Sequence, residues 1–144
     1  MTGDVRAATL DLTNAQLIAL FGTPVEMIPA AGAGTVIVPI AVVARLVRGT
    51  TAYSASTNLI LVYATDATTL NNTISVLFAN GPGGVLDQLF HGRRATTYTG
   101  PNNFNPSNRA VNITLAVDIN AGGADDLLRV NVLYEVVPAA ALGY

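Results

Sequence analysis

One apolar run, residues 35–47 (TVIVPIAVVARLV), restricts the folds open to this chain more than any other stretch. Read with a period of two, one side holds Val36, Val38, Ile40, Val42, Ala44 and Leu46, and the other holds Ile37, Pro39, Ala41 and Val43 before Arg45 brings the first charge. A strand with one face in water alternates apolar and polar residues. We therefore expect a strand covered on both faces, by its own chain or by another. The run is too short and too Pro-interrupted for a membrane span, which needs about 20 apolar residues.

The rest of the chain predicts a small β protein around this strand. Further strands are expected at 6–12, at 23–29 between two prolines and hence at a sheet edge, at 58–64 and at 85–90. Residues 66–80 are ambiguous between a short helix and a strand at 73–78, and 95–108 has the composition of a polar loop. This pattern predicts an all-β fold, an antiparallel β-sandwich that is jelly-roll-like, in one domain over 1–144 with a flexible arm at 1–5.

A single short helix is expected at residues 13–21. Thr13 and Gln16 have the spacing of a capping box, and Gly22 stands where a glycine often ends a helix. Three residues share the face that we expect to pack on the sheet: Leu17, Ile18 and Phe21. At about two turns, this helix is an accessory to the sheets.

The last quarter of the chain alternates most regularly. Apolar residues at odd positions from 111 to 119, and at even positions from 128 to 136, alternate with mostly polar ones. Val132 and Leu115 are therefore expected to point inward, and Asn131 and Thr114 outward. Because a loop rich in Gly and Asp joins the two segments, the pattern predicts that they pair as a long hairpin.

The composition indicates a surface poor in charge. Charged residues make up 11% of the chain, against about 25% in an ordinary domain. The net charge of −2 argues against a nucleic-acid-binding surface. The strands expected at 35–47 and at 58–64 are both apolar on both sides. We therefore expect a homo-oligomer whose interface includes the outer residues of these two strands: Ile37, Pro39, Ala41, Val43, Ile60 and Val62.

The sequence contains no recognisable catalytic constellation. With one histidine and no cysteine it lacks the donors of a cupin-type metal site, and it has no G-x-S-x-G motif or phosphate-binding loop. We expect no enzymatic activity, no cofactor and no metal. His91, followed by Arg93 and Arg94, forms either a base or anion pocket or a solvated loop. Asp118, Asp125 and Asp126 form either a Ca²⁺ site or an ordinary hairpin tip.

Two aromatic residues in the polar loop, Tyr98 and Phe104, are open to a contact function. They could line a sugar site, or they could meet a protein partner together with Arg93 and Arg94. The N-terminus lacks the apolar core of a secretory signal, so we expect synthesis in the cytoplasm.

Two stretches resemble small structural proteins of tailed bacteriophages. Residues 23–46 (TPVEMIPAAGAGTVIVPIAVVARL), followed by Gly49-Thr50-Thr51-Ala52-Tyr53, are similar to a strand, turn and apolar strand of that family. The segment DINAGGADDLLRVNVLYEVV is similar to its closing hairpin, although Leu133 stands where the family often has Tyr. Together the two stretches cover about half of the chain, and residues 65–108 match nothing in the family.

The resemblance implies a β-sandwich component of the virion, and most specifically a trimeric capsid decoration (cement) protein. Its partner would be the major capsid protein on the capsid surface, with no role for nucleic acid or a membrane. The resemblance carries over no catalytic residue. The alternatives are a tail or neck component of the virion and a carbohydrate-binding β-sandwich module.

Overall fold

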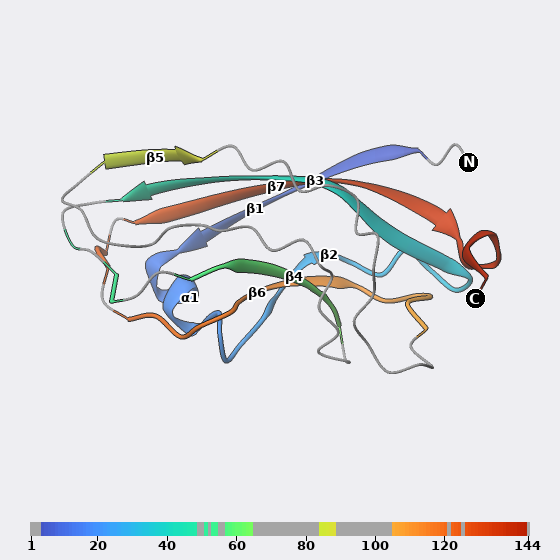
Figure 1. Ribbon diagram of the computed structural model, residues 1–144, viewed down its shortest axis with the longest axis horizontal. Helices are drawn as coiled ribbons and strands as arrows, with labels where there is room; N and C mark the ends of the chain where they lie inside the picture. The colour runs from blue at the N-terminus through green and yellow to red at the C-terminus, as the bar shows by residue number, and fades with distance from the viewer. Residues whose placement is uncertain are drawn as a thin grey trace.

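The protein is described by a computed structural model that covers residues 4–48, 51, 53–54, 57–64, 84–88 (main chain only), 105–120, 122–124 and 126–143. Its strands form two antiparallel sheets stacked in two layers (Figure 1). The elements are β1 (Val5–Thr13), α1 (Asn14–Ala19), β2 (Val25–Ile28), β3 (Thr35–Arg48), β4 (Leu59–Tyr63), β5 (Gly84–Gln88), β6 (Val111–Leu115), β7 (Leu127–Pro138) and a 3₁₀ helix, η1 (Ala139–Leu142). Over the described residues, the expected antiparallel β fold with a short helix after the first strand is confirmed.

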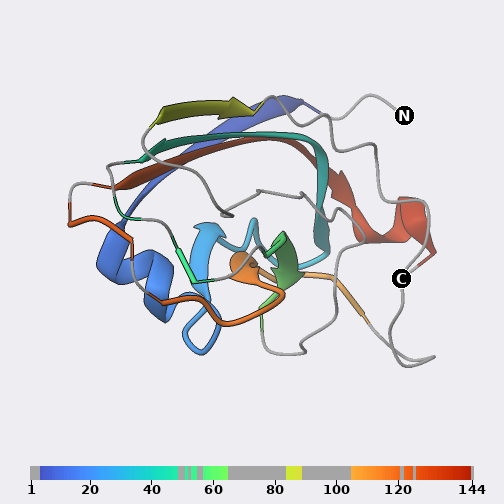
Figure 2. The same ribbon diagram turned by 60° about the vertical axis from the view of Figure 1, so that its left-hand side comes forward.

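The strand pairing is nested. The order is β1-β7-β3-β5 in the four-stranded sheet and β2-β6-β4 in the three-stranded sheet. The first described strand thus pairs with the last, β2 with β6, and β3 with β5. Successive strands in this series alternate between the two sheets. Figure 2 shows the four-stranded sheet curving over β2, β6 and β4.

The core lies between the two layers. Its fully buried side chains come from both sheets and from α1, and they form one cluster that includes Leu12, Leu17, Val42, Leu61, Ile113 and Val132. The alternation predicted for residues 111–119 and 128–136 is confirmed in part: residues 111, 113, 115 and 119 and residues 128, 130 and 132 are buried, whereas Val117 is 50% exposed and residues 134 and 136 are half-buried. Tyr63 is buried and donates its hydroxyl to the carbonyl oxygen of Ile37, which ties β4 to β3 across the core (2.6 Å).

The start of the helix is confirmed and its end is corrected. Thr13 is the N-cap, and it forms the predicted capping box with Gln16. The helix ends at Ala19, with Leu20 as its C-cap, and Gly22 does not adopt the left-handed conformation. Leu20 is buried beside Leu17, whereas Phe21 is 49% exposed. The predicted packing of Phe21 on the sheet was wrong, because the helix ends two residues before Phe21.

A β-bulge in β3 overturns the predicted faces of the apolar run. Pro39 pairs with Tyr134 and Ala41 with Leu133, so Ile40 has no partner on β7. An extra residue in one strand shifts its alternation by one position. Ile37 and Pro39 therefore share the inner face with Val42. Ala41 shares the outer face with Val43 and Arg45. Our single-period interpretation mixed the two faces.

The predicted pairing of the last two strands with each other was wrong. β6 pairs with β2 and β4 in one sheet, and β7 pairs with β1 and β3 in the other. The Gly- and Asp-rich segment between them crosses from one layer to the other. Alternation identifies a strand and its buried side, but it does not identify the strand's partner.

The edge position predicted for residues 23–29 is confirmed, because β2 is the first strand of its sheet. Residues 84–88 pair with β3, near the strand expected at 85–90. Strand β1 begins at Val5, inside the expected flexible arm. The candidate strand at 73–78 lies outside the described residues, as do residues 95–104 of the predicted polar loop.

Among the described residues, no helix has the length and apolar character needed to cross a membrane.

Candidate interaction surface

The outer face of the four-stranded sheet is built from side chains of three neighbouring strands. β7 lies between β1 and β3, and directly opposed residues of antiparallel strands share a face. Since residues 128, 130 and 132 of β7 point into the core, residues 129, 131, 133 and 135 point outward. Across β1, β7 and β3 the outer rows are Val5–Glu135–Val38, Ala7–Leu133–Ala41, Thr9–Asn131–Val43 and Asp11–Arg129–Arg45.

The first two rows form an apolar half of this face, defined here as Val5, Ala7, Val38, Ala41 and Leu133. Leu133 is 45% exposed and Val5 is 60% exposed. Leu133 lies between two alanines, so a long side chain stands beside two short ones. Glu135 is the one charged residue in these two rows. A protruding leucine flanked by alanines is the kind of apolar feature that another protein surface buries well.

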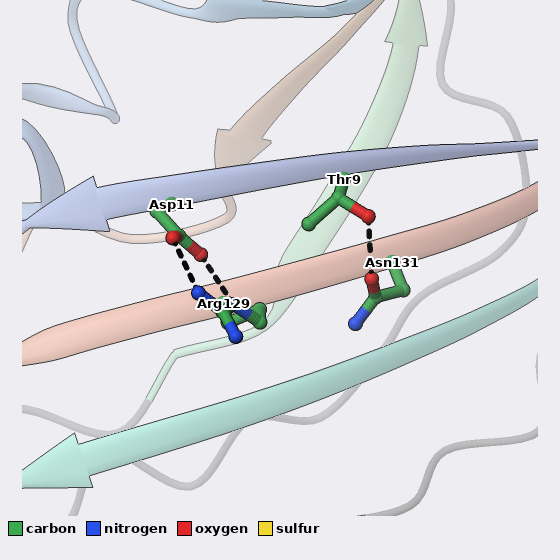
Figure 3. Close-up of polar contacts among 4 residues, drawn as sticks. All are labelled: Thr9, Asp11, Arg129 and Asn131. Atoms are coloured by element: carbon green, nitrogen blue, oxygen red, sulfur yellow. Dashed lines mark hydrogen bonds and ion pairs between the residues drawn. The ribbon is translucent and has the colours of Figure 1, made fainter.

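The last two rows form a polar half, defined as Thr9, Asn131, Val43, Asp11, Arg129 and Arg45. Figure 3 shows its four bonded side chains, from β1 and β7. The hydroxyl of Thr9 donates to Oδ1 of Asn131 (2.7 Å). Nε and an Nη of Arg129 donate to the two carboxylate oxygens of Asp11 at 2.7 and 2.8 Å, a bidentate pair. Asp11 therefore neutralises the charge of Arg129, which lies on β7 directly opposite a second arginine, Arg45 of β3.

This pair gives a testable pH dependence. The hydrogen bond from Arg129, and its positive charge, lower the pKa of the Asp11 carboxyl below its ordinary value. The pair's contribution to stability is therefore complete above the pKa that Asp11 has in the unfolded chain, and it is lost as the pH falls through the lowered pKa. We expect Arg129→Gln to raise the pKa of Asp11, as followed by NMR titration of its carboxyl carbon.

The matched control for this titration is Asn131→Ala in the adjoining row, which should leave the pKa of Asp11 where it is. If Arg129→Gln and Asn131→Ala give the same pKa for Asp11, the bidentate pair does not persist in solution.

Hollows on the described surface include two that adjoin the sheets. One, of about 100 Å³, is lined by Arg45, Val47, Leu127 and Arg129 at the end of the polar half. The other, of about 220 Å³, is lined by Ala64, Ser107, Asn108, Arg109 and Ala110. Pockets for small ligands usually measure about 300–1,000 Å³. Both of these hollows are below that range.

The structure divides the six residues predicted for an oligomer interface. Ala41 and Val43 lie on the outer face described above and are half-buried. Ile37 is 1% exposed and Pro39 is buried, because the bulge at Ile40 turns them to the inner face. Their assignment to an exposed interface was wrong.

The other two predicted interface residues belong to the opposite layer. Ile60 and Val62 are half-buried and alternate with the buried residues of β4, so they lie on the outer face of the three-stranded sheet. The outer residues of β3 and those of β4 therefore lie on different sheets. An interface through Ala41 and Val43 and one through Ile60 and Val62 are separate predictions.

The candidate contact residues of the polar loop lie in a separate part of the sequence from this surface. His91, Arg93, Arg94, Tyr98 and Phe104 all lie outside the described residues. The anion pocket, the sugar site and the capsid contact suggested for them stay predictions.

The acidic residues considered for Ca²⁺ have different environments. Asp118 is exposed, and Asp125 lies outside the described residues. Asp126 is 2% exposed, and its Oδ2 accepts the main-chain N–H of Gly123 at 3.0 Å. This carboxylate is therefore part of a turn. In the part of the chain that the structure describes, no group of three or more His, Cys, Asp or Glu side chains is arranged to hold a metal ion.

Sequence reasoning did not single out the exposed leucine at the centre of this surface. Leu133 is an apolar residue in the outward phase of β7, between Asn131 and Glu135. That signal was present in the alternation, and an apolar residue at an outward position is the one to test for a contact.

Comparisons of this chain with protein-family models, curated proteins and solved structures find no match. The resemblance to bacteriophage proteins therefore stays an expectation that depends on the quoted motifs.

Proposed function

We propose that this chain is a structural protein of a bacteriophage virion, most specifically a capsid decoration protein that stabilises the head through protein–protein contacts. The observation that carries the contact function is the apolar half of the outer face, where Leu133 and Val5 are exposed. In a chain with only 11% charged residues, such a surface favours association with protein. The assignment to a virion and to its capsid depends on the sequence resemblance alone.

The strand order supports the jelly-roll form of this proposal. A jelly roll is a long antiparallel hairpin rolled so that its strand pairs alternate between two sheets. The pairs β1–β7, β2–β6 and β3–β5 are nested in this way and belong alternately to the two sheets. A tail or neck component would have the same architecture. None of the described residues favours the carbohydrate-binding alternative.

Association is tested first on the purified protein. We expect a closed homo-oligomer, and the resemblance implies a trimer, so light scattering at micromolar concentration should give about three times 14.9 kDa. Leu133→Arg should lower this mass, because it places a charge in the apolar half, while the circular dichroism stays unchanged. Val62→Arg is the matched variant on the other sheet, and whichever variant dissociates the oligomer identifies the interface.

A monomer of 14.9 kDa that stays soluble would contradict the proposed homo-oligomer. The role in the virion is tested by a quantified gel of purified particles. A decoration protein should be present in hundreds of copies per particle, whereas a tail or neck component should be present in a few or in tens. Absence of the chain from the particles would contradict both roles.

A further inference from the structure

Strand β1 is a long sheet edge. It is the first strand of the four-stranded sheet, and among the described residues β7 is the only strand that pairs with it. The pairing runs through nine consecutive positions, from Val5 with Glu135 to Thr13 with Leu127, without a register shift. Figure 3 shows β7 with β1 on one side and β3 on the other. One row of main-chain N–H and C=O groups of β1 thus points away from β7.

This edge has few of the features that usually prevent strand addition. Proteins protect an edge with proline, charged side chains, a bulge, or a very short strand. β1 (VRAATLDLT) has no proline, no lysine and no bulge, its two charged residues are Arg6 and Asp11, and at nine residues it is longer than the average strand. Seven of its residues are exposed or carry small side chains, and residues 5, 6 and 7 are all exposed in succession. Most residues of the strand are therefore open to solvent.

We propose that β1 pairs with β1 of a second copy of this chain, antiparallel across a two-fold axis, so that two four-stranded sheets join into one. A two-fold axis perpendicular to a sheet keeps outer side chains opposite outer ones and inner opposite inner ones. A pairing centred on Arg6 or on Asp11 would set like charges opposite each other. A pairing centred on Ala7, Ala8 or Thr9 sets small, uncharged side chains on the axis.

The same pairing enlarges the contact surface. With Ala7 on the axis, its row with Leu133 and Ala41 continues into the same row of the second copy, whereas with Ala8 or Thr9 on the axis it continues into a row of the polar half. The carboxylate of Asp11 is already bound by Arg129 of its own copy and adds no unpaired charge at the seam. A second copy, with an identical strand and an identical free edge, is therefore the partner whose chemistry the edge fits.

This pairing goes beyond the proposed function and does not depend on it. An isologous contact joins copies in twos, whereas the resemblance implies association in threes. Pairing through β1 alone gives two copies, and together with a three-fold interface it gives six. The mass in solution therefore separates the two associations.

The decisive experiment is disulfide trapping, since the chain has no cysteine. Single variants Ala7→Cys, Ala8→Cys and Thr9→Cys place one thiol at each candidate position on the axis. Only the residue on the axis lies opposite its own copy, where the Cα atoms are about 4.5–5.5 Å apart and within reach of a disulfide. We expect one of the three variants to form a covalent dimer under mild oxidation, much faster than the others.

The control is Ala116→Cys, an exposed alanine that follows β6 in the other sheet. The pairing is wrong if all three β1 variants cross-link no faster than this control, or if all three cross-link alike in proportion to concentration. A mass of three copies without a cross-link overturns the β1 pairing and leaves the proposed trimer intact. A cross-link with a mass of two copies supports the pairing and contradicts the trimer.

Discussion

Lysine in place of Val132 should prevent the chain from folding stably. Val132 is 0% exposed in the middle of β7, with Ala8 of β1 and Val42 of β3 directly opposite it. A charge buried there without a partner costs at least about 3 kcal/mol, and a whole domain is stable by only about 5–15 kcal/mol. We expect insoluble protein on expression, or a urea midpoint lowered by a large fraction of the wild-type value.

The neighbouring variant Asn131→Lys is the matched control. Asn131 points outward and loses one exposed hydrogen bond, that from the hydroxyl of Thr9. The lysine can extend into solvent, so the urea midpoint should change little. Equal solubility and equal midpoints for the two variants would contradict the inward and outward positions described for β7.

Alanine in place of Gly122 should strongly destabilise the folded chain. Gly122 has a φ of +85°, and a Cβ atom there would lie 2.6 Å from Oδ1 of Asn14 and 2.7 Å from Cζ of Tyr53, and would also meet Cε1 of that ring. Tyr53 is buried, so the ring cannot move aside freely. The left-handed backbone and the overpacking together should cost about 2–5 kcal/mol in the free energy of unfolding.

Gly34→Ala separates these two costs. Gly34 also has a left-handed φ, +73°, but a Cβ atom there meets nothing within 4 Å. Its cost should be the backbone term alone, about 1–2 kcal/mol. Denaturant unfolding of both variants measures the difference. If Gly34→Ala is as destabilising as Gly122→Ala, the close packing of Gly122 on Tyr53 is not the cause.

Features that depend on neighbouring residues were predictable from the sequence. The capping box of Thr13 and Gln16 forms as expected because a side chain three residues away reaches a free N–H in any helix that starts there. The buried sides of β6 and β7 follow from alternation for a similar reason, since a strand turns successive side chains to opposite faces.

Features that join distant residues were not predictable in this way. Alternation in β6 and β7 was compatible with a hairpin, yet the two strands lie in different sheets and pair with β2, β4, β1 and β3. The bulge at Ile40 is a second example. An unbroken apolar run contains no polar residue that would mark the shift of phase, so only the pairing with β7 reveals it.

The candidate surface combines both kinds of information. The sequence by itself determined that β7 has an outward phase and that Leu133 lies in it, because side-chain direction follows from local geometry. The tertiary structure decided that Ala7 and Ala41, from strands far away in the chain, flank Leu133 and leave it protruding. Strand partners are selected by the packing of the whole core, which no local pattern encodes, so the surface exists only once β1, β7 and β3 lie side by side.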